Sequence, residues 1–228
     1  PKVNMDTGKL VGFEALARWF KPNGGMVPPG VFIPIAEASG LVEQLDRVIL
    51  LKSCSAIKQL EAAGIQVPIS FNVSCHELLL SDFSSSILEV LAAENVAPQQ
   101  VDMEITETLA MINYEEVSAT LRKLIQLGMD VSIDDFGTGF SSLSHVTELA
   151  ATTLKIDKSF VQYLGEKSSS EHIVDMIIRV ATRFGMKVIA EGVETALQRD
   201  KHIELGGTNG QGYFDARPMP IEPVPQTH

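Results

Sequence analysis

Residues 129–135 have the sequence MDVSIDD, a short strand-like run that ends in two aspartates, Asp134 and Asp135. Comparable β-rich runs recur along the chain, at 10–13, 67–71, 101–105, 153–156 and 186–190. Their composition favours strands buried within a sheet, and longer segments with helical periodicity separate them. Strands that alternate with helices predict a parallel sheet whose strands are joined by crossover helices.

The clearest helix follows residue 113. Val117, Leu121 and Leu124 recur at helical spacing, Asn113 stands at the N-cap position and Gly128 at the C-terminal stop. We expect further helices over 42–63, over 171–184, and from a cap at Thr195 to about Leu205, with a short polar loop at 167–170.

Polar residues stand at or just after the end of each strand-like run, where a buried strand does not favour them. These residues are Glu14, Asn72, Glu104, Asp134 with Asp135, Lys155 with Asp157, and Glu191. In α/β folds, active-site residues lie at the carboxyl ends of the strands, which form one rim of the sheet. A barrel brings such residues to one point whereas an open sheet spreads them along an edge, so we favour a barrel.

Five of these carboxylates would gather at one point with Lys155 as the only cation in the set: Glu14, Glu104, Asp134, Asp135 and Glu191. Carboxylates a few ångströms apart cannot all stay ionised without counter-charge. Oxygen ligands suit Mg²⁺ or Mn²⁺, and Asp134 with Asp135 could hold two such ions, although an Asp-Asp pair alone is also a common turn. We interpret the five histidines as surface or packing residues because none has the spacing of a metal ligand.

The composition excludes several classes of protein. The chain has 228 residues and a net charge of −11, which argues against binding of polymeric nucleic acid. It has no apolar run of membrane-spanning length and no secretory signal, so we expect a cytoplasmic protein without membrane contact. Cys54 and Cys75 form no ligand pair and are expected to be reduced thiols. A first residue other than Met suggests a piece of a longer protein.

Taken together, the ordered motifs resemble those of the EAL family of bacterial cyclic-di-GMP phosphodiesterases. The resemblance covers 1–219 and leaves 220–228 as a C-terminal tail. It rests on EALARW at 14–19, FIPIAE at 32–37, NVS at 72–74, EITE at 104–107, DDFGTG at 134–139, LKID at 154–157, EGVE at 191–194, and QGY at 211–213 before Arg217 and Pro218. It implies an α/β fold: a TIM-like (β/α)₈ barrel with the first strand antiparallel.

The resemblance also implies roles for individual residues. One metal would be held by Glu14, Asn72, Glu104 and Asp134, and a second by Asp134, Asp135 and Glu191. Glu14, Lys155, Glu191 and Gln211 would be catalytic, with Lys155 positioning the attacking water. Leu16, Arg18, Asp157, Glu194 and Pro218 would bind substrate. Glu107 would anchor the loop 135–143, which lies near the family's dimer interface.

The activity implied is metal-dependent hydrolysis of cyclic-di-GMP to linear pGpG by in-line attack of a metal-activated water. A homodimer, and a sensory or cyclase domain before Pro1, are also implied. Some family members have lost activity, so a non-catalytic cyclic-di-GMP receptor is the main alternative. An enolase-type enzyme, which also combines strand-end carboxylates, Mg²⁺ and a lysine, is a more remote one.

Overall fold

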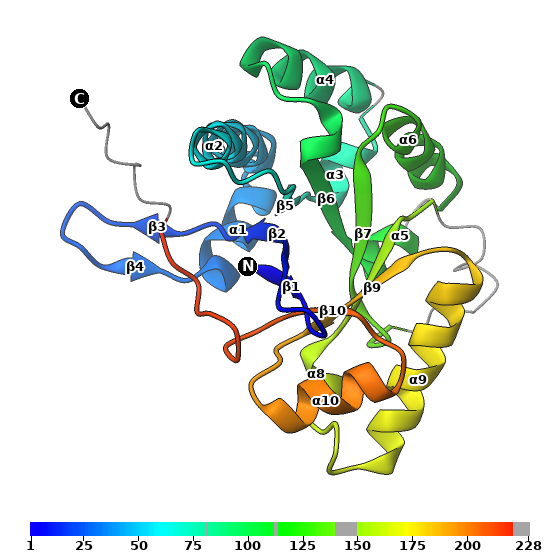
Figure 1. Cartoon of the computed structure of the whole chain (residues 1–228). Coiled ribbons are helices and arrows are strands. Elements are labelled where there is room, and N and C mark those ends of the chain that lie inside the picture. Colours follow the sequence, from blue (N-terminus) through cyan, green and yellow to red (C-terminus); the bar gives the residue numbers. More distant parts are fainter. Residues whose placement is uncertain (81, 112–113, 140–149, 221–228) are drawn as a thin grey trace.

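The computed structural model describes residues 1–80, 82–111, 114–139 and 150–220, and these residues form a closed eight-stranded barrel surrounded by helices (Figure 1). Around the barrel the strands follow the order β1, β10, β9, β8, β7, β6, β5, β2. They are β1 (Lys2–Asn4), β2 (Leu10–Ala15), β5 (Ile69–Asn72), β6 (Val101–Thr106), β7 (Asp130–Phe136), β8 (Thr153–Ile156), β9 (Lys187–Glu191) and β10 (Asn209–Gln211). Strands β3 (Trp19–Phe20) and β4 (Met26–Val27) form a separate hairpin beside it.

The first strand closes the barrel in the antiparallel sense. β1 pairs antiparallel with both β2 and β10, whereas the other neighbouring pairs of the barrel are parallel. The predicted TIM-like barrel with an antiparallel first strand is therefore confirmed. All six strand-like runs of the sequence correspond to strands of this barrel.

Helices follow most of the strands and pack around the barrel (Figure 1). They are α1 (Pro29–Ala38), α2 (Val42–Ala62), α3 (Cys75–Leu78), α4 (Phe83–Glu94), the 3₁₀ turn η1 (Pro98–Gln100), α5 (Glu107–Met111), α6 (Tyr114–Gln126), α8 (Lys158–Val161), α9 (Ser168–Arg183) and α10 (Ala196–Glu204). The prediction of a loop at 167–170 is wrong, because α9 already begins at Ser168, with Lys167 at its N-cap. Serines are well tolerated in the first turn of a helix.

Local signals account for several helix ends. Gly128 has φ of +96° just after α6, and Thr195 caps α10 by accepting a hydrogen bond from the Gln198 N–H at 3.2 Å. The Gln198 side chain in turn accepts from the Thr195 N–H, completing a capping box. The expected N-cap residue of α6, Asn113, lies outside the described residues.

Alternation along the strands separates an apolar outer face from a polar interior. On β7, Val131 and Ile133 are fully buried in the hydrophobic core, to which the helices contribute Val117, Leu121 and Leu124 of α6. Ser132, between Val131 and Ile133, donates instead to Asp102 of the neighbouring strand. Since successive side chains point to opposite faces, the polar residues of the strands share the inside of the barrel.

Strand register aligns the polar ends of the strands. Asn72 pairs with Glu104, Thr106 with Asp134, and Gln211 with Glu191. Among the residues described, no helix combines the length and apolarity needed to cross a membrane. The assignment of 1–219 to the barrel and of 220–228 to a tail stays a prediction, and 221–228 lie outside the described residues.

Candidate active site

Lys155 is the centre of a carboxylate cluster at the carboxyl ends of the strands. Its ammonium nitrogen lies 2.6 Å from Oε2 of Glu104, 2.7 Å from Oε1 of Glu191, 3.1 Å from Oδ1 of Asp134 and 3.7 Å from Oε2 of Glu14. These five side chains come from five different strands, β8, β6, β9, β7 and β2. The barrel thus brings together residues that are up to 177 positions apart, from Glu14 to Glu191.

Burial governs the protonation of the cluster. Desolvation raises the pKa of Glu191 to about 8 and also raises that of Asp134. The pKa of Glu14 is raised by desolvation and by the negative charge of Glu104. Burial acts on Glu104 in the same direction, but two lysines outweigh it and lower the Glu104 pKa to about 2. Glu104 is therefore charged at neutral pH, whereas burial disfavours the charged forms of Glu14, Asp134 and Glu191.

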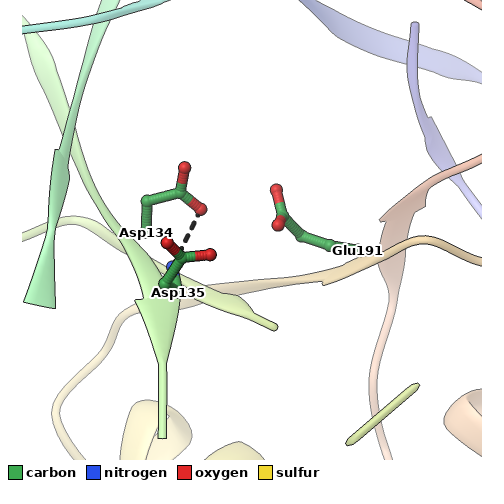
Figure 2. Close-up of side chains that lie close together, drawn as sticks. All are labelled: Asp134, Asp135 and Glu191. Carbon is green, nitrogen blue, oxygen red and sulfur yellow. Dashed lines mark hydrogen bonds between the residues drawn. The ribbon is translucent and has the colours of Figure 1, made fainter. Parts of the chain in front are cut away.

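Asp134, Asp135 and Glu191 form the part of the cluster that is open to a cation. Each offers a carboxylate oxygen, and these three oxygens lie within 4.8 Å of one another. Figure 2 shows the two aspartates together at the end of β7, with Glu191 facing them from β9. The Asp135 N–H donates to Asp134 at 2.9 Å, and Asp135 has φ of +53°. Aspartate is one of the few non-glycine residues that tolerate this left-handed conformation, which ends β7 in a sharp turn.

Two amides connect the acids at the rim. Nε2 of Gln211 donates to Oε2 of Glu14 at 2.6 Å and to Oε1 of Glu191 at 3.0 Å, while Nδ2 of Asn72 lies 3.4 Å from Oε1 of Glu14. Gln211 therefore holds two of the carboxylates at a fixed separation.

Glu107 lies just beyond the cluster, at the start of α5. Its Oε2 accepts the N–H of Gly137 at 2.8 Å and the N–H of Gly139 at 3.2 Å. A Cβ at Gly139 would lie 2.8 Å from the Glu107 carboxylate, so glycine is required for this approach. Glu107 thus fixes the backbone that follows Asp135, while residues 140–143 of the same loop lie outside the described residues.

The residues expected to bind substrate occupy loops after the strands. Leu16 and Arg18 follow β2, Glu194 follows β9 and Pro218 follows β10, and all four are exposed. Asp157 also caps α8 by accepting from the Ser159 N–H at 2.9 Å.

Sequence reasoning missed a second lysine in the site. The expectation that Lys155 is the only cation among the acids is wrong, because Lys2 of β1 also contacts Glu104, at 2.7 Å, and Asp102, at 3.1 Å. Asp102 was missed too; it lies inside the barrel, where Ser132 donates to both of its oxygens. Only the alternation of side chains along a strand could have indicated Lys2 and Asp102, which like Glu104 occupy inward-facing positions of their strands.

The donor set fits a hard divalent cation. Four carboxylates converge on Lys155, and the group open to a metal contains oxygen ligands and no histidine or cysteine. Carboxylate and amide oxygens are the ligands that Mg²⁺ and Mn²⁺ prefer. Asp134, Asp135 and Glu191 would hold one ion, and Glu14, Asn72 and Glu104 lie where they could hold another with Asp134.

Comparison with known proteins defines the family. The sequence matches the EAL domain over residues 1–218, so the chain belongs to the EAL domain family. It is 37% identical over 224 residues to an uncharacterized protein of Mycobacterium tuberculosis, covering 97% of this chain and 36% of that protein. It is 35% identical to the bifunctional diguanylate cyclase/cyclic di-GMP phosphodiesterase MucR of Pseudomonas aeruginosa, covering 97% of this chain and 33% of MucR.

The structural comparison agrees with the sequence comparison. The barrel superimposes on the PaMucR phosphodiesterase, solved as a c-di-GMP complex, with a TM-score of 0.90 and 35% identity, covering 97% of this chain and 90% of that one. The chain spans about a third of the length of the curated relatives it matches.

Proposed function

We propose that this chain is a metal-dependent phosphodiesterase that hydrolyses cyclic-di-GMP to linear pGpG. The observation that carries the proposal is the convergence of Glu14, Glu104, Asp134 and Glu191 on one point, with Asp135 beside them, in an EAL domain. Relatives named as cyclic-di-GMP phosphodiesterases support the choice of substrate.

Bound divalent cations would explain how an acidic site accepts an anionic substrate. Held by the carboxylates and Asn72, Mg²⁺ or Mn²⁺ would lower the pKa of a water and offset charge on the phosphate oxygens. Gln211 keeps Glu14 and Glu191 in place for this binding. Lys155, released in part from its carboxylate partners once other cations neutralise them, would orient the water for in-line attack.

The reaction needs one water and no other reactant. The water oxygen bonds to phosphorus, the bond from phosphorus to the 3′-oxygen breaks, and the 3′-oxygen takes up a proton. Leu16, Arg18, Asp157, Glu194 and Pro218 would contact the nucleotide from the loops around the rim. Glu107 would keep the Asp135 backbone in its left-handed conformation during turnover.

We also propose that the whole protein contains additional domains and forms a homodimer. The much greater length of the relatives supports further domains, of a sensory or cyclase type as in the bifunctional MucR.

Product analysis by chromatography tests the proposed function. Purified protein is incubated with cyclic-di-GMP and Mn²⁺, beside a sample in EDTA and the Glu14→Ala variant. We expect pGpG in the first sample alone. Nucleotide binding without product would favour the receptor alternative, and hydrolysis that persists in EDTA would refute the role of the metal.

A further inference from the structure

Lys2 is a buried lysine inside the barrel, one layer below the rim. Its side chain is 5% exposed, and its ammonium nitrogen lies 2.7 Å from Oε1 of Glu104 and 3.1 Å from Oδ2 of Asp102. Burial of a lysine is costly unless it is paired, so these two contacts determine where the ammonium group lies.

The Glu104 carboxylate is divided between two lysines. Oε1 points down the barrel to Lys2, and Oε2 points to Lys155 at 2.6 Å, toward the side where Asp134 and Glu191 gather. Because one oxygen is held by Lys2, rotation of the carboxylate away from the rim would break a buried, charge-assisted hydrogen bond. The second oxygen is thereby presented to the rim.

Neighbouring residues hold Lys2 itself in place. Ser132 donates to both oxygens of Asp102 at 2.9 Å, which anchors the second partner of Lys2. Lys2 is paired in register with Gly12 on β2, where an added Cβ would lie 3.6 Å from Cδ of Lys2 and only 3.2 Å from the Pro68 carbonyl oxygen. Asp102 and Glu104 of β6 therefore hold the ammonium group of Lys2, and Ser132 of β7 holds Asp102 in place.

We propose that Lys2 is a positioning residue for the metal centre: it holds Glu104 so that Oε2 faces the divalent cation. This inference rests on the proposed function. Lys2 lies behind Glu104 and is no ligand itself, so it acts through Glu104. Partners that orient a metal ligand commonly contribute about 10–100-fold to metal affinity.

Electrostatic repulsion alone predicts the opposite change in metal affinity when Lys2 is removed. A lysine near a cation site repels the cation, so removal of Lys2 would tighten metal binding if repulsion were its main effect. If positioning dominates, removal weakens binding. The direction of the change therefore distinguishes the two roles.

The test measures Mn²⁺ affinity by electron paramagnetic resonance, without nucleotide, in folded variants. Lys2→Met removes the contact, and Lys2→Met/Asp102→Asn removes it while keeping the net charge of the cluster. Lys187→Met is the matched control, because Lys187 pairs with Asp130 at 2.8 Å at the other end of the strands. We expect about 10-fold weaker Mn²⁺ binding or more in the first two variants and unchanged binding in the control.

Turnover separates this role from a direct catalytic one. At saturating Mn²⁺ the rate of the double variant should return to within a few-fold of the wild-type rate, since Lys2 does not touch the substrate. Should both variants fail to fold, Lys2→Gln keeps an N–H donor without the charge, and we expect its Mn²⁺ affinity to fall less than about 10-fold.

Two outcomes are decisive and distinct. Equal or tighter Mn²⁺ binding in the folded double variant, or loss of affinity in Lys2→Gln as large as that expected for Lys2→Met, would overturn the inference while leaving the proposed function intact. Wild-type protein that binds no Mn²⁺ would instead overturn the metal dependence on which both proposals stand.

Discussion

Lys155 and Glu191 are in buried contact, with Nζ of the lysine 2.7 Å from Oε1 of the glutamate. The lysine side chain is fully buried and that of the glutamate is 16% exposed, so water does little to screen the charge of the lysine. Burial alone would lower the pKa of Lys155, yet the surrounding acids raise it well above its ordinary value. In the absence of metal, Lys155 is thus the main counter-charge of the rim.

Lys155→Met should destabilise the metal-free protein, because it leaves buried acids without their common partner. We expect a loss of about 3–5 kcal/mol in the free energy of unfolding, partly recovered with Mn²⁺. Turnover should fall more than Mn²⁺ affinity. Urea unfolding with and without Mn²⁺ measures the effect, and Lys58→Met, which breaks the exposed pair with Glu94, serves as the control with a loss below about 1 kcal/mol. Unchanged stability of the metal-free variant would contradict this.

Glu14→Ala should abolish most of the activity while the barrel stays folded. Glu14 accepts hydrogen bonds from Gln211 and Asn72 and lies near Lys155, but Glu104 and Asp134 repel it, so the interactions lost on its removal are partly offset by relief of two repulsions. We expect kcat/KM to fall at least about 100-fold, because a direct ligand is lost. Glu89→Ala, an exposed acid on α4, should behave like wild type. A folded Glu14→Ala protein with near-normal turnover would rule out its role as a ligand.

Metal binding should release protons near neutral pH. Desolvation raises the pKa of Glu191 to about 8, so at pH 7 this carboxyl is mostly protonated, whereas a metal ligand must be ionised. We expect about one proton released per chain at pH 7 and fewer at pH 9. Calorimetric Mn²⁺ titrations in two buffers with different ionisation enthalpies give the number directly. An identical heat in both buffers at pH 7 would mean that Glu191 is already ionised.

His202 should make stability depend on acidity, independently of the site. It is fully buried in α10, and desolvation lowers its pKa to about 4. The unfolded chain therefore takes up a proton first, so the contribution is complete above about pH 6.5 and is lost as the pH falls toward 4. The loss amounts to about 3 kcal/mol.

Urea unfolding between pH 7 and pH 4 isolates this contribution by comparing wild type with His202→Leu. The variant should lose less stability over that interval, and His172→Leu, which changes an exposed histidine of α9, should follow wild type. Parallel curves for wild type and His202→Leu would show that the ring accepts its proton inside the fold without cost.

Residues with local signals were predictable from the sequence. The Thr195 cap, the glycine stop after α6 and the acids at the strand ends each follow from a short stretch of chain, and the structure has them in the expected elements. The antiparallel β1 came from the resemblance alone, because nothing within Lys2–Asn4 records which strands it pairs with.

The remaining features depend on closure of the barrel. Lys2 stands alone near the start of the chain, where a lysine usually faces water, and only pairing of β1 with both β2 and β10 encloses it. Asp102 lies at the beginning of β6, away from the strand end on which the prediction relied. Helix α1 also went unpredicted; it begins at Pro29, a favourable first position, yet contains Pro34, which reads as a helix breaker.

Hydrolysis of cyclic-di-GMP in water enriched in ¹⁸O tests the central claim most directly. With Mn²⁺ present, we expect pGpG that carries a single ¹⁸O atom in its 5′-terminal phosphate, detected by mass spectrometry, and no product in EDTA. Intact cyclic-di-GMP after prolonged incubation with Mn²⁺, or pGpG without the label, would contradict hydrolysis by a water activated at this carboxylate site.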